Sequence, residues 1–104
     1  MRKLEKQLFL AVESGDAQKV KKLLLEKLNP DSVNNATEKI TPLMAAVKNN
    51  DIPMIRLLLH YKADANKQDF MGRDSFDYAE KLPSIKALLV LFRYADLEDE
   101  VDEA

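Results

Sequence analysis

The apolar residues of this chain recur with helical spacing in two segments, one near its start and one at its middle. Val20, Leu23 and Leu24 occupy positions i, i+3 and i+4 of the first segment. Ile55, Leu58 and Leu59 occupy the same positions in the second. This spacing places the apolar side chains on one face of an α-helix. The pattern therefore predicts two amphipathic helices of similar length.

The two helices belong to copies of a longer unit. Residues 8–25 align without gaps under residues 43–60, with Leu8 on Leu43, which is an offset of 35. In this register one Ala falls on an Ala, one Asp falls on an Asp, and the other matched positions pair one larger apolar residue with another. A unit that recurs every 20 to 50 residues is the signature of a stacked repeat architecture.

A third and weaker copy covers residues 72–91. Its first part aligns with the central unit at an offset of 33, whereas Ile85, Leu88 and Leu89 align with the second helix of that unit at an offset of 30. This register predicts that the joint between the two helices is about three residues shorter than in the other units. The sequence thus predicts an array of three units.

Each unit is predicted to be a pair of antiparallel helices. Thr41 is a suitable N-cap for the first helix of the central unit, and Pro42 fits the first helical position. The Asn49-Asn50 pair then ends that helix, because Asn tolerates left-handed backbone geometry, and Ser14-Gly15 is the same joint in the first unit, with Gly15 as the residue after the helix. One pair cannot bury its own apolar face, so three stacked pairs are expected to share a core.

The central unit carries a family resemblance. Residues 41–74 read TPLMAAVKNNDIPMIRLLLHYKADANKQDFMGRD, and this stretch resembles the ankyrin repeat, a module of about 33 residues with the signature T-P-L-H-x-A. Met44 stands where the family prefers His, so we expect a bracing side-chain hydrogen bond to be missing. The matching positions are Thr41, Pro42, Leu43 and Ala46 in the signature, and Asp69 and Gly72 in the D-x-x-G turn pattern that follows.

The resemblance implies an all-α fold, an ankyrin-repeat solenoid of three helix-turn-helix repeats with short β-hairpin-like turns. We expect one domain over residues 1–95, with repeats at about 5–37, 38–69 and 70–95. The link between the first two repeats departs from the family pattern, because Lys39 stands where the turn Gly would be. We expect the preceding Asn34-Asn35 pair to supply the left-handed residue instead.

The charges are unevenly distributed along the chain. Residues 96–104 hold six acids and no base, which leaves residues 1–95 with 16 bases against 12 acids. We expect residues 96–104 to form a flexible acidic tail. Such a tail is either a solvated terminus or an acidic arm that covers a basic face or engages a partner.

The composition argues against catalysis, cofactors and metals. The chain lacks Cys and has a single His, His60, placed near the expected end of a helix, where the helix dipole favours it. With only Gly15 and Gly72, no glycine-rich phosphate loop can be formed. We therefore expect no enzyme activity, no cofactor and no metal.

The sequence also predicts a cytoplasmic protein that binds neither nucleic acid nor membrane. The bases are scattered and the aromatic residues form no stacking platform, and no stretch approaches the roughly 20 apolar residues of a membrane span. The lysines of residues 19–27 are expected on the convex side of the stack. They are either simply solvated or attract acidic partners.

A protein-binding surface remains, and the resemblance implies that it lies along the hairpin tips and the first helices. In the second tip, Phe70 and Met71 are not required by the turn, and an aromatic, a Met and an Arg together are typical of interface hot spots. The alternative is that Phe70 packs back onto the adjacent helix. The candidate binding residues are Phe70, Met71 and Arg73, Lys48 and Asn49, Glu13 and Ser14, and Thr37, Glu38 and Ile40.

The predicted function is non-catalytic protein–protein recognition, as an adaptor or an inhibitor, by a chain that is a monomer rather than a homo-oligomer. One alternative is a self-assembling repeat unit or a fragment of a longer array. A more distant one is an immunity-type inhibitor of a toxin or enzyme. The end faces discriminate among these readings, because a large exposed apolar patch there would favour assembly. The residues concerned are Leu4 and Leu8 at one end, and Leu91, Phe92 and Tyr94 at the other.

Overall fold

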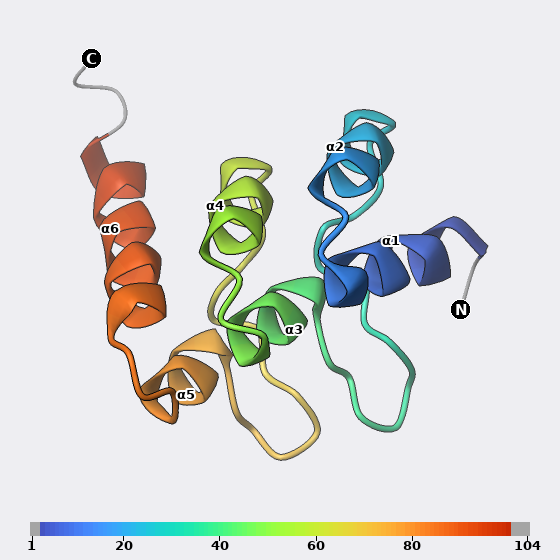
Figure 1. Ribbon diagram of the computed structural model, residues 1–104. Coiled ribbons are helices and arrows are strands. Elements are labelled where there is room, and N and C mark those ends of the chain that lie inside the picture. Colours follow the sequence, from blue (N-terminus) through green and yellow to red (C-terminus); the bar gives the residue numbers. More distant parts are fainter. Residues whose placement is uncertain (1–2, 101–104) are drawn as a thin grey trace.

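The computed structural model describes residues 3–100, and its helices form three antiparallel pairs (Figure 1). No strand occurs within these residues, and the two long loops are hairpin-shaped. The predicted all-α solenoid of three helix-turn-helix repeats is confirmed. The helices are α1 (Lys3–Ser14), α2 (Ala17–Leu25), α3 (Pro42–Lys48), α4 (Ile52–His60), α5 (Ser75–Glu80) and α6 (Lys86–Glu100).

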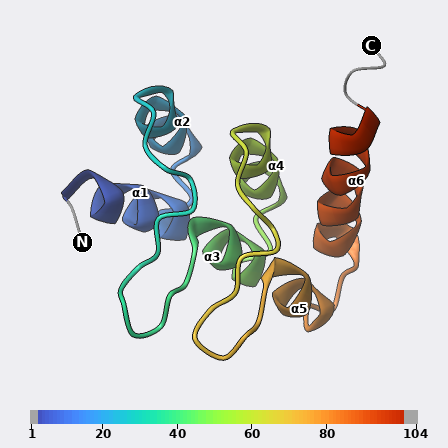
Figure 2. The ribbon, with the colours of Figure 1, turned by 180° about the vertical axis from the view of Figure 1, so that it is seen from behind.

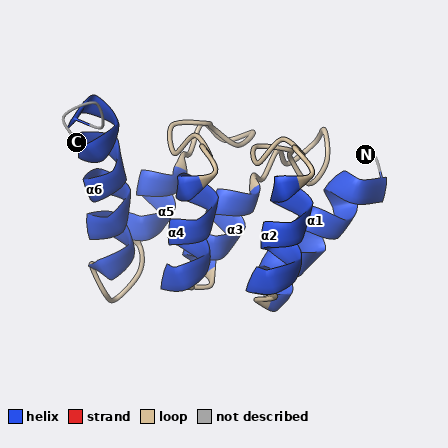
Figure 3. Ribbon diagram, turned by 90° about the horizontal axis from the view of Figure 1, so that it is seen from above, coloured by secondary structure: helices blue, strands red, loops and turns tan. Residues whose placement is uncertain are grey.

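The first and second helices of the repeats form two rows (Figures 1 and 2). α3 packs between α1 and α5, and α4 packs between α2 and α6. The loops before α3 and α5 project from the same edge of the stack (Figure 3). The central repeat therefore buries both of its faces, which is why residues 41–47 are all buried.

The apolar stripes of the first two repeats form the centre of the core. Val20 and Leu24 of α2, and Ile55 and Leu58 of α4, are at most 4% exposed. Leu43, from the first helix of the central repeat, is fully buried beside them. Leu59, the third residue of the predicted stripe in α4, is only half-buried. The helical periodicity read from the sequence is therefore largely that of the core in these two repeats.

The N-terminus of α3 is capped as predicted, with an additional contact from Met44. The Thr41 Oγ1 accepts a hydrogen bond from the Met44 N–H at 3.2 Å, and the Thr41 N–H donates to the Met44 Sδ at 3.4 Å. A thioether sulfur is a weak acceptor. Met44, which is fully buried, thus replaces part of the bracing that was expected to be missing.

The left-handed residues agree with the prediction at the helix joints and differ from it in the first loop. Gly15 and Asn50 have φ values of 78° and 53°, as expected. In the loop, Lys39 itself is left-handed, at 56°, so the assignment to Asn34-Asn35 is wrong. Asn34 and Asn35 instead accept backbone N–H donors with their side-chain oxygens, which requires no left-handed backbone there.

The two hairpin loops differ in length, and this explains the unequal repeat offsets. The first hairpin loop (residues 34–40) is closed by the Asn34 N–H donating to the Ile40 carbonyl at 2.8 Å. The second hairpin loop (residues 69–73) is closed by the Asp69 N–H donating to the Arg73 carbonyl at 2.8 Å. The first loop is two residues longer, which is the difference between the offsets of 35 and 33.

The predicted register of the last helix is wrong. Ile85 and Leu89, which were expected in the core, are 64% and 56% exposed. The residues of α6 that enter the core are Ala87, Val90 and Leu91, which are at most 7% exposed. The buried face of α6 is therefore rotated away from the predicted one.

The joint before α6 causes this difference. Residues 81–85 separate α5 from α6, whereas residues 49–51 separate α3 from α4. The joint of the third repeat is longer than that of the second, not shorter as predicted. Pro83 lies in it, and the Ser84 Oγ accepts a hydrogen bond from the Lys86 N–H at 3.2 Å, which fixes the start of α6.

The predicted boundary between domain and tail lies within a helix. Residues 96–100 continue α6, which ends at Glu100. Residues 101–104 lie outside the described residues. The flexibility of residues 96–104 stays a prediction.

Replacing Ser75 with Ala should raise the free energy of unfolding by about 1 kcal/mol. Ser75 is 1% exposed, and no described protein atom accepts or donates a hydrogen bond at its Oγ, so burial of this hydroxyl carries a desolvation cost. The Ser75 N–H, which donates to the Ala65 carbonyl at 3.2 Å, is retained in the variant. Urea unfolding followed by circular dichroism measures the change, with the exposed Ser14 changed to Ala as the control. Equal or lower stability of the Ser75 variant would contradict the expectation.

Candidate protein-binding groove

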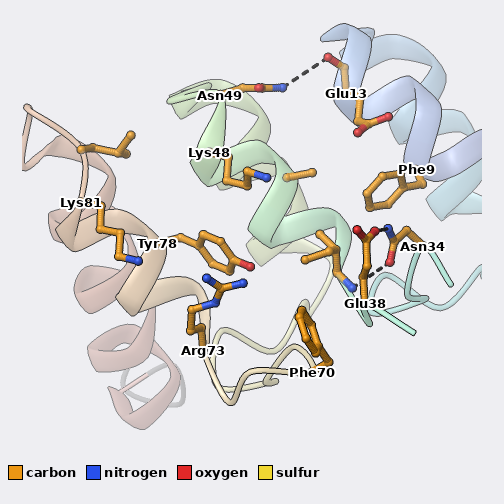
Figure 4. Close-up of a pocket in the computed structure, with 13 residues that line it drawn as sticks. Phe9, Glu13, Asn34, Glu38, Lys48, Asn49, Phe70, Arg73, Tyr78 and Lys81 are labelled. Atoms are coloured by element: carbon orange, nitrogen blue, oxygen red, sulfur yellow. Dashed lines mark hydrogen bonds between the residues drawn. The ribbon is translucent and has the colours of Figure 1, made fainter. Parts of the chain in front are cut away.

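A groove with a volume of about 680 Å³ lies between the hairpin loops and the first helices of the repeats (Figure 4). Its walls come from α1, α3 and α5 and from the two hairpin loops. We call it the binding groove. It crosses all three repeats, so a ligand lying in it would contact residues far apart in the sequence.

The groove brings together most of the residues predicted to bind a partner. Ser14, Thr37 and Met71 do not line it: the Ser14 Oγ donates to the Ala11 carbonyl of its own helix at 3.2 Å. Whether the lining residues bind a partner stays a prediction. The predicted residues that line the groove are Glu13, Glu38, Ile40, Lys48, Asn49, Phe70 and Arg73.

Sequence analysis missed other lining residues, among them Phe9, Tyr78 and Lys81. The repeat register contained the signal for Lys81. Lys81 aligns with Lys48 at the offset of 33, and Lys48 aligns with Glu13 at the offset of 35. A residue within one position of the end of the first helix thus enters the groove in every repeat. Tyr78 carried no such signal, because the central repeat has the small Ala45 at the matching position.

The second hairpin loop presents two exposed apolar side chains, of which Phe70 lines the groove and Met71 does not. Phe70 is 56% exposed and Met71 is 62% exposed. Phe70 therefore does not pack back into the core. Its N–H donates to the Glu38 carbonyl at 3.0 Å, which connects the two hairpin loops and fixes where the Phe70 side chain starts.

The second hairpin loop is organised around the carboxylate of Asp69, whose side chain is fully buried. Its Oδ1 accepts hydrogen bonds from the N–H groups of Met71 and Arg73, both at 2.9 Å. Its Oδ2 accepts from the Arg73 Nε at 2.9 Å and from the Tyr78 hydroxyl. This network connects the loop to α5 and holds the Arg73 guanidinium beside the Tyr78 ring, with its carbon 5.3 Å from the ring centroid.

The network shifts the pKa values of its members in opposite directions. Burial alone would raise the pKa of Asp69, but the hydrogen bonds from Tyr78, Arg73 and Met71 outweigh it and lower the pKa to about 2. Burial and the hydrogen bond to Asp69 raise the pKa of Tyr78 to about 12. Asp69 is therefore ionised and Tyr78 neutral throughout the physiological range.

The groove is also braced between the first two repeats. The Asn49 Nδ2 donates to the Glu13 carbonyl at 3.3 Å, and the Asn34 Nδ2 donates to the Glu38 Oε1 at 2.7 Å (Figure 4). These bonds orient the polar side chains of the groove without burying them. The groove can therefore contact a ligand through hydrogen bonds, charged groups and apolar side chains.

The described residues hold neither a metal-binding cluster nor a membrane-spanning helix. Within residues 3–100, no group of three or more His, Asp or Glu side chains is placed to hold a metal ion. In the same part of the chain, no helix combines the length and the apolar character needed to cross a bilayer.

The stacked helix pairs, with their loops on one side, define the class of this chain as a helical-repeat solenoid. The family model for ankyrin repeats in three copies matches residues 8–100. The chain belongs to the ankyrin-repeat family. Repeats of this family generally act as non-catalytic modules for protein–protein interaction.

Two similar sequences from fowlpox virus (strain NVSL) carry the ankyrin-repeat name. One, FPV014, is 35% identical over 94 residues, which cover 88% of this chain and 21% of the relative. The other, FPV230, is 33% identical over 110 residues, which cover 94% of this chain and 58% of the relative. The chain thus spans about a fifth of the length of FPV014 and somewhat more than half of the length of FPV230.

Proposed function

We propose that this chain is an adaptor or inhibitor that binds one protein partner in the binding groove. The observation that carries the proposal is the position of Phe70 and Arg73. An exposed aromatic ring and a guanidinium held by a buried carboxylate stand together on the wall of a groove. Side chains of these types dominate the binding energy at protein interfaces, particularly when they are held in place before binding.

The proposal includes a monomer that acts in the cytoplasm. The groove is complete within one chain, so a partner can be bound without a second copy. Neither a cofactor nor a catalytic step is part of the proposal. An inhibitor would act by covering a surface of the partner.

Replacing Phe70 with Ala should weaken binding of the partner at least tenfold, a loss of about 1.4 kcal/mol or more. Met71 is the matched control, because it lies next to Phe70 and is exposed but does not line the groove. A photo-crosslinking residue placed at Asn49, inside the groove, would capture the partner in a lysate of the source cells. Mass spectrometry would then identify it.

The proposal predicts that one protein crosslinks to the wild type, that Phe70→Ala removes most of the crosslink, and that Met71→Ala leaves it unchanged. Both variants are first shown by circular dichroism to be folded. Absence of any crosslinked protein, or equal capture by all three chains, would overturn the assignment of the groove.

One observation favours self-assembly as a second candidate function. Leu89 and Phe92 of α6, with Ile85 of the joint just before it, follow an i, i+4, i+7 spacing and are 52–64% exposed. At the other end of the stack Leu4 is 43% exposed, whereas Leu8 is fully buried. Light scattering over a range of concentrations decides between the two: a constant monomer mass supports the first candidate, and a mass that rises with concentration supports the second.

A further inference from the structure

The charges of the binding groove are segregated along its length. The residues that align at the ends of the three first helices are Glu13, Lys48 and Lys81, so the sign changes from negative to positive between the first and second repeats. The first hairpin loop adds Glu38 at the negative end, and the second adds Arg73 at the positive end. A groove with this polarity favours a bound chain whose acidic part lies at the positive end.

At the positive end, three cationic side chains line the groove together with one aromatic ring. Lys48 of α3, Arg73 of the second hairpin loop and Lys81, which follows α5, share this part of the wall with Tyr78 (Figure 4). The Lys48 Nζ lies 6.0 Å from the centroid of the ring, and the Arg73 guanidinium carbon lies 5.3 Å from it. Among the described residues, neither Lys48 nor Lys81 forms an ion pair.

Asp69 offsets one of these three positive charges and does not fill the space between them. Both oxygens of its buried carboxylate are occupied by Met71, Arg73 and Tyr78 donors. The bond to Nε leaves the terminal N–H groups of the Arg73 guanidinium as donors. The guanidinium is therefore fixed in orientation before any ligand arrives, which lowers the entropy cost of binding.

Next to this cationic cluster the groove is lined by apolar side chains. Ile40 of the first hairpin loop and Phe70 of the second belong to this part of the wall, and Phe9 of α1 lies further along it, beside Asn34 and Glu38 (Figure 4). Phe9 is buried and Ile40 is half-buried, so both are rigid parts of the wall, while Phe70 is exposed. The groove thus offers an anion-binding end and an apolar middle.

We propose that the partner presents an acidic peptide segment in which an Asp or Glu precedes or follows an apolar side chain by a few residues. The carboxylate lies between Lys48, Arg73 and Lys81, and the apolar side chain packs against Phe70. The inference rests on the proposed function, because it names the chemistry of the partner for the same groove. It excludes a segment that is basic where it meets Lys48, Arg73 and Lys81, because the positive end would repel it.

The test uses a phage-displayed library of random 12-residue peptides, selected on the immobilised full chain. Enriched peptides are then synthesised and their affinities measured by fluorescence anisotropy. The test variant is Lys48→Glu with Lys81→Glu, and the matched control is Lys19→Glu with Lys22→Glu. All four side chains are exposed, and the control pair lies on α2, outside the groove, with the same change in net charge.

The inference predicts that enriched peptides share an acid near an apolar residue. It also predicts that Lys48→Glu with Lys81→Glu weakens the binding of these peptides at least tenfold. The control pair should change their affinity less than threefold. Affinity should also fall as sodium chloride rises from 0.05 to 0.3 M, because exposed charge pairs are screened. Replacing the shared acid of the peptide with Gln should remove the difference between the wild type and the test variant.

Other outcomes separate this inference from the proposed function. Peptides that lose binding on Phe70→Ala but carry no acid would overturn the inference and leave the groove assignment intact. If the test variant and the control variant lose peptide affinity equally, the effect is a general electrostatic attraction, and the inference is overturned. Failure to enrich any peptide dependent on Phe70 or on the lysines would count against both. Phosphatidylserine vesicles that sediment with the wild type but not with the Lys48→Glu, Lys81→Glu variant would replace the peptide with a lipid surface.

Discussion

Replacing Asp69 with Ala should lower the free energy of unfolding by about 3 kcal/mol. The buried carboxylate accepts four hydrogen bonds, from two backbone N–H groups, the Arg73 Nε and the Tyr78 hydroxyl. Hydrogen bonds to a charged group contribute about 1.5–3 kcal/mol each, and water replaces only some of them after truncation. Since the network connects the second hairpin loop to α5, the loss should destabilise the interface between the second and third repeats.

Urea unfolding followed by circular dichroism measures this loss. Asp64→Ala is the control, because Asp64 is exposed and its side chain accepts a hydrogen bond only from the Asn66 N–H among the described residues. The control should lose less than about 1 kcal/mol. If the two variants lose similar amounts, Asp69 does not organise the loop in the way its contacts indicate.

The lowered pKa of Asp69 gives the same prediction a pH dependence. A carboxylate whose pKa is about 2 in the folded chain and 3.8 in the unfolded chain stabilises the fold above pH 4. That contribution is lost as the pH falls from about 4 to 2. Burial raises the pKa of Asp31, so that residue opposes the trend when it becomes protonated. In Asp69→Ala, stability should therefore change less between pH 4 and 2 than in the wild type.

The fold of the first two repeats could be predicted from sequence because several independent signals agreed. Thr41 and Pro42 define the start of α3, and Gly15 and Asn50 define the helix joints, all through local backbone chemistry. The i, i+3, i+4 stripes then define the buried faces. Local and global preferences point to the same structure in these repeats, which is what makes such a sequence readable.

The register of α6 could not be predicted in this way. The run Leu88-Leu89-Val90-Leu91-Phe92 is apolar at consecutive positions, so several i, i+3, i+4 stripes fit the helix and periodicity does not choose among them. The choice depends on the joint at residues 81–85 and on packing against α4. These are tertiary constraints, and a count of apolar matches does not contain them.

The candidate site was predictable to a similar extent. The hairpin tips follow from the repeat register, and Phe70 and Met71 stood out because the turn itself does not require them. Phe70 lines the groove and Met71 does not. Tyr78 and the Asp69 network could not be found, because their roles depend on a contact between a loop and a helix nine residues further along the chain. Lys39 shows the reverse case, in which the loop geometry imposes a left-handed residue that its side chain does not favour.

Replacing Leu58 with Ala should lower the free energy of unfolding by about 4 kcal/mol, close to the largest cost expected for a buried leucine. Leu58 is fully buried in α4, and α4 packs against both α2 and α6. The cavity would thus lie in the repeat through which the outer repeats are coupled. In a repeat array, stability is the sum of the repeats and of the interfaces between neighbours. Weakening the central repeat should therefore destabilise the whole stack in one transition.

Leu89→Ala is the control that makes this prediction specific. Leu89 has the same side chain and also lies in the second helix of a repeat, but it is 56% exposed on α6. Its replacement should cost less than about 1 kcal/mol. Urea unfolding followed by circular dichroism compares the two variants with the wild type. A loss at Leu89 as large as that at Leu58 would mean that α6 packs in the register expected from sequence periodicity, and the core described here would be wrong in the third repeat.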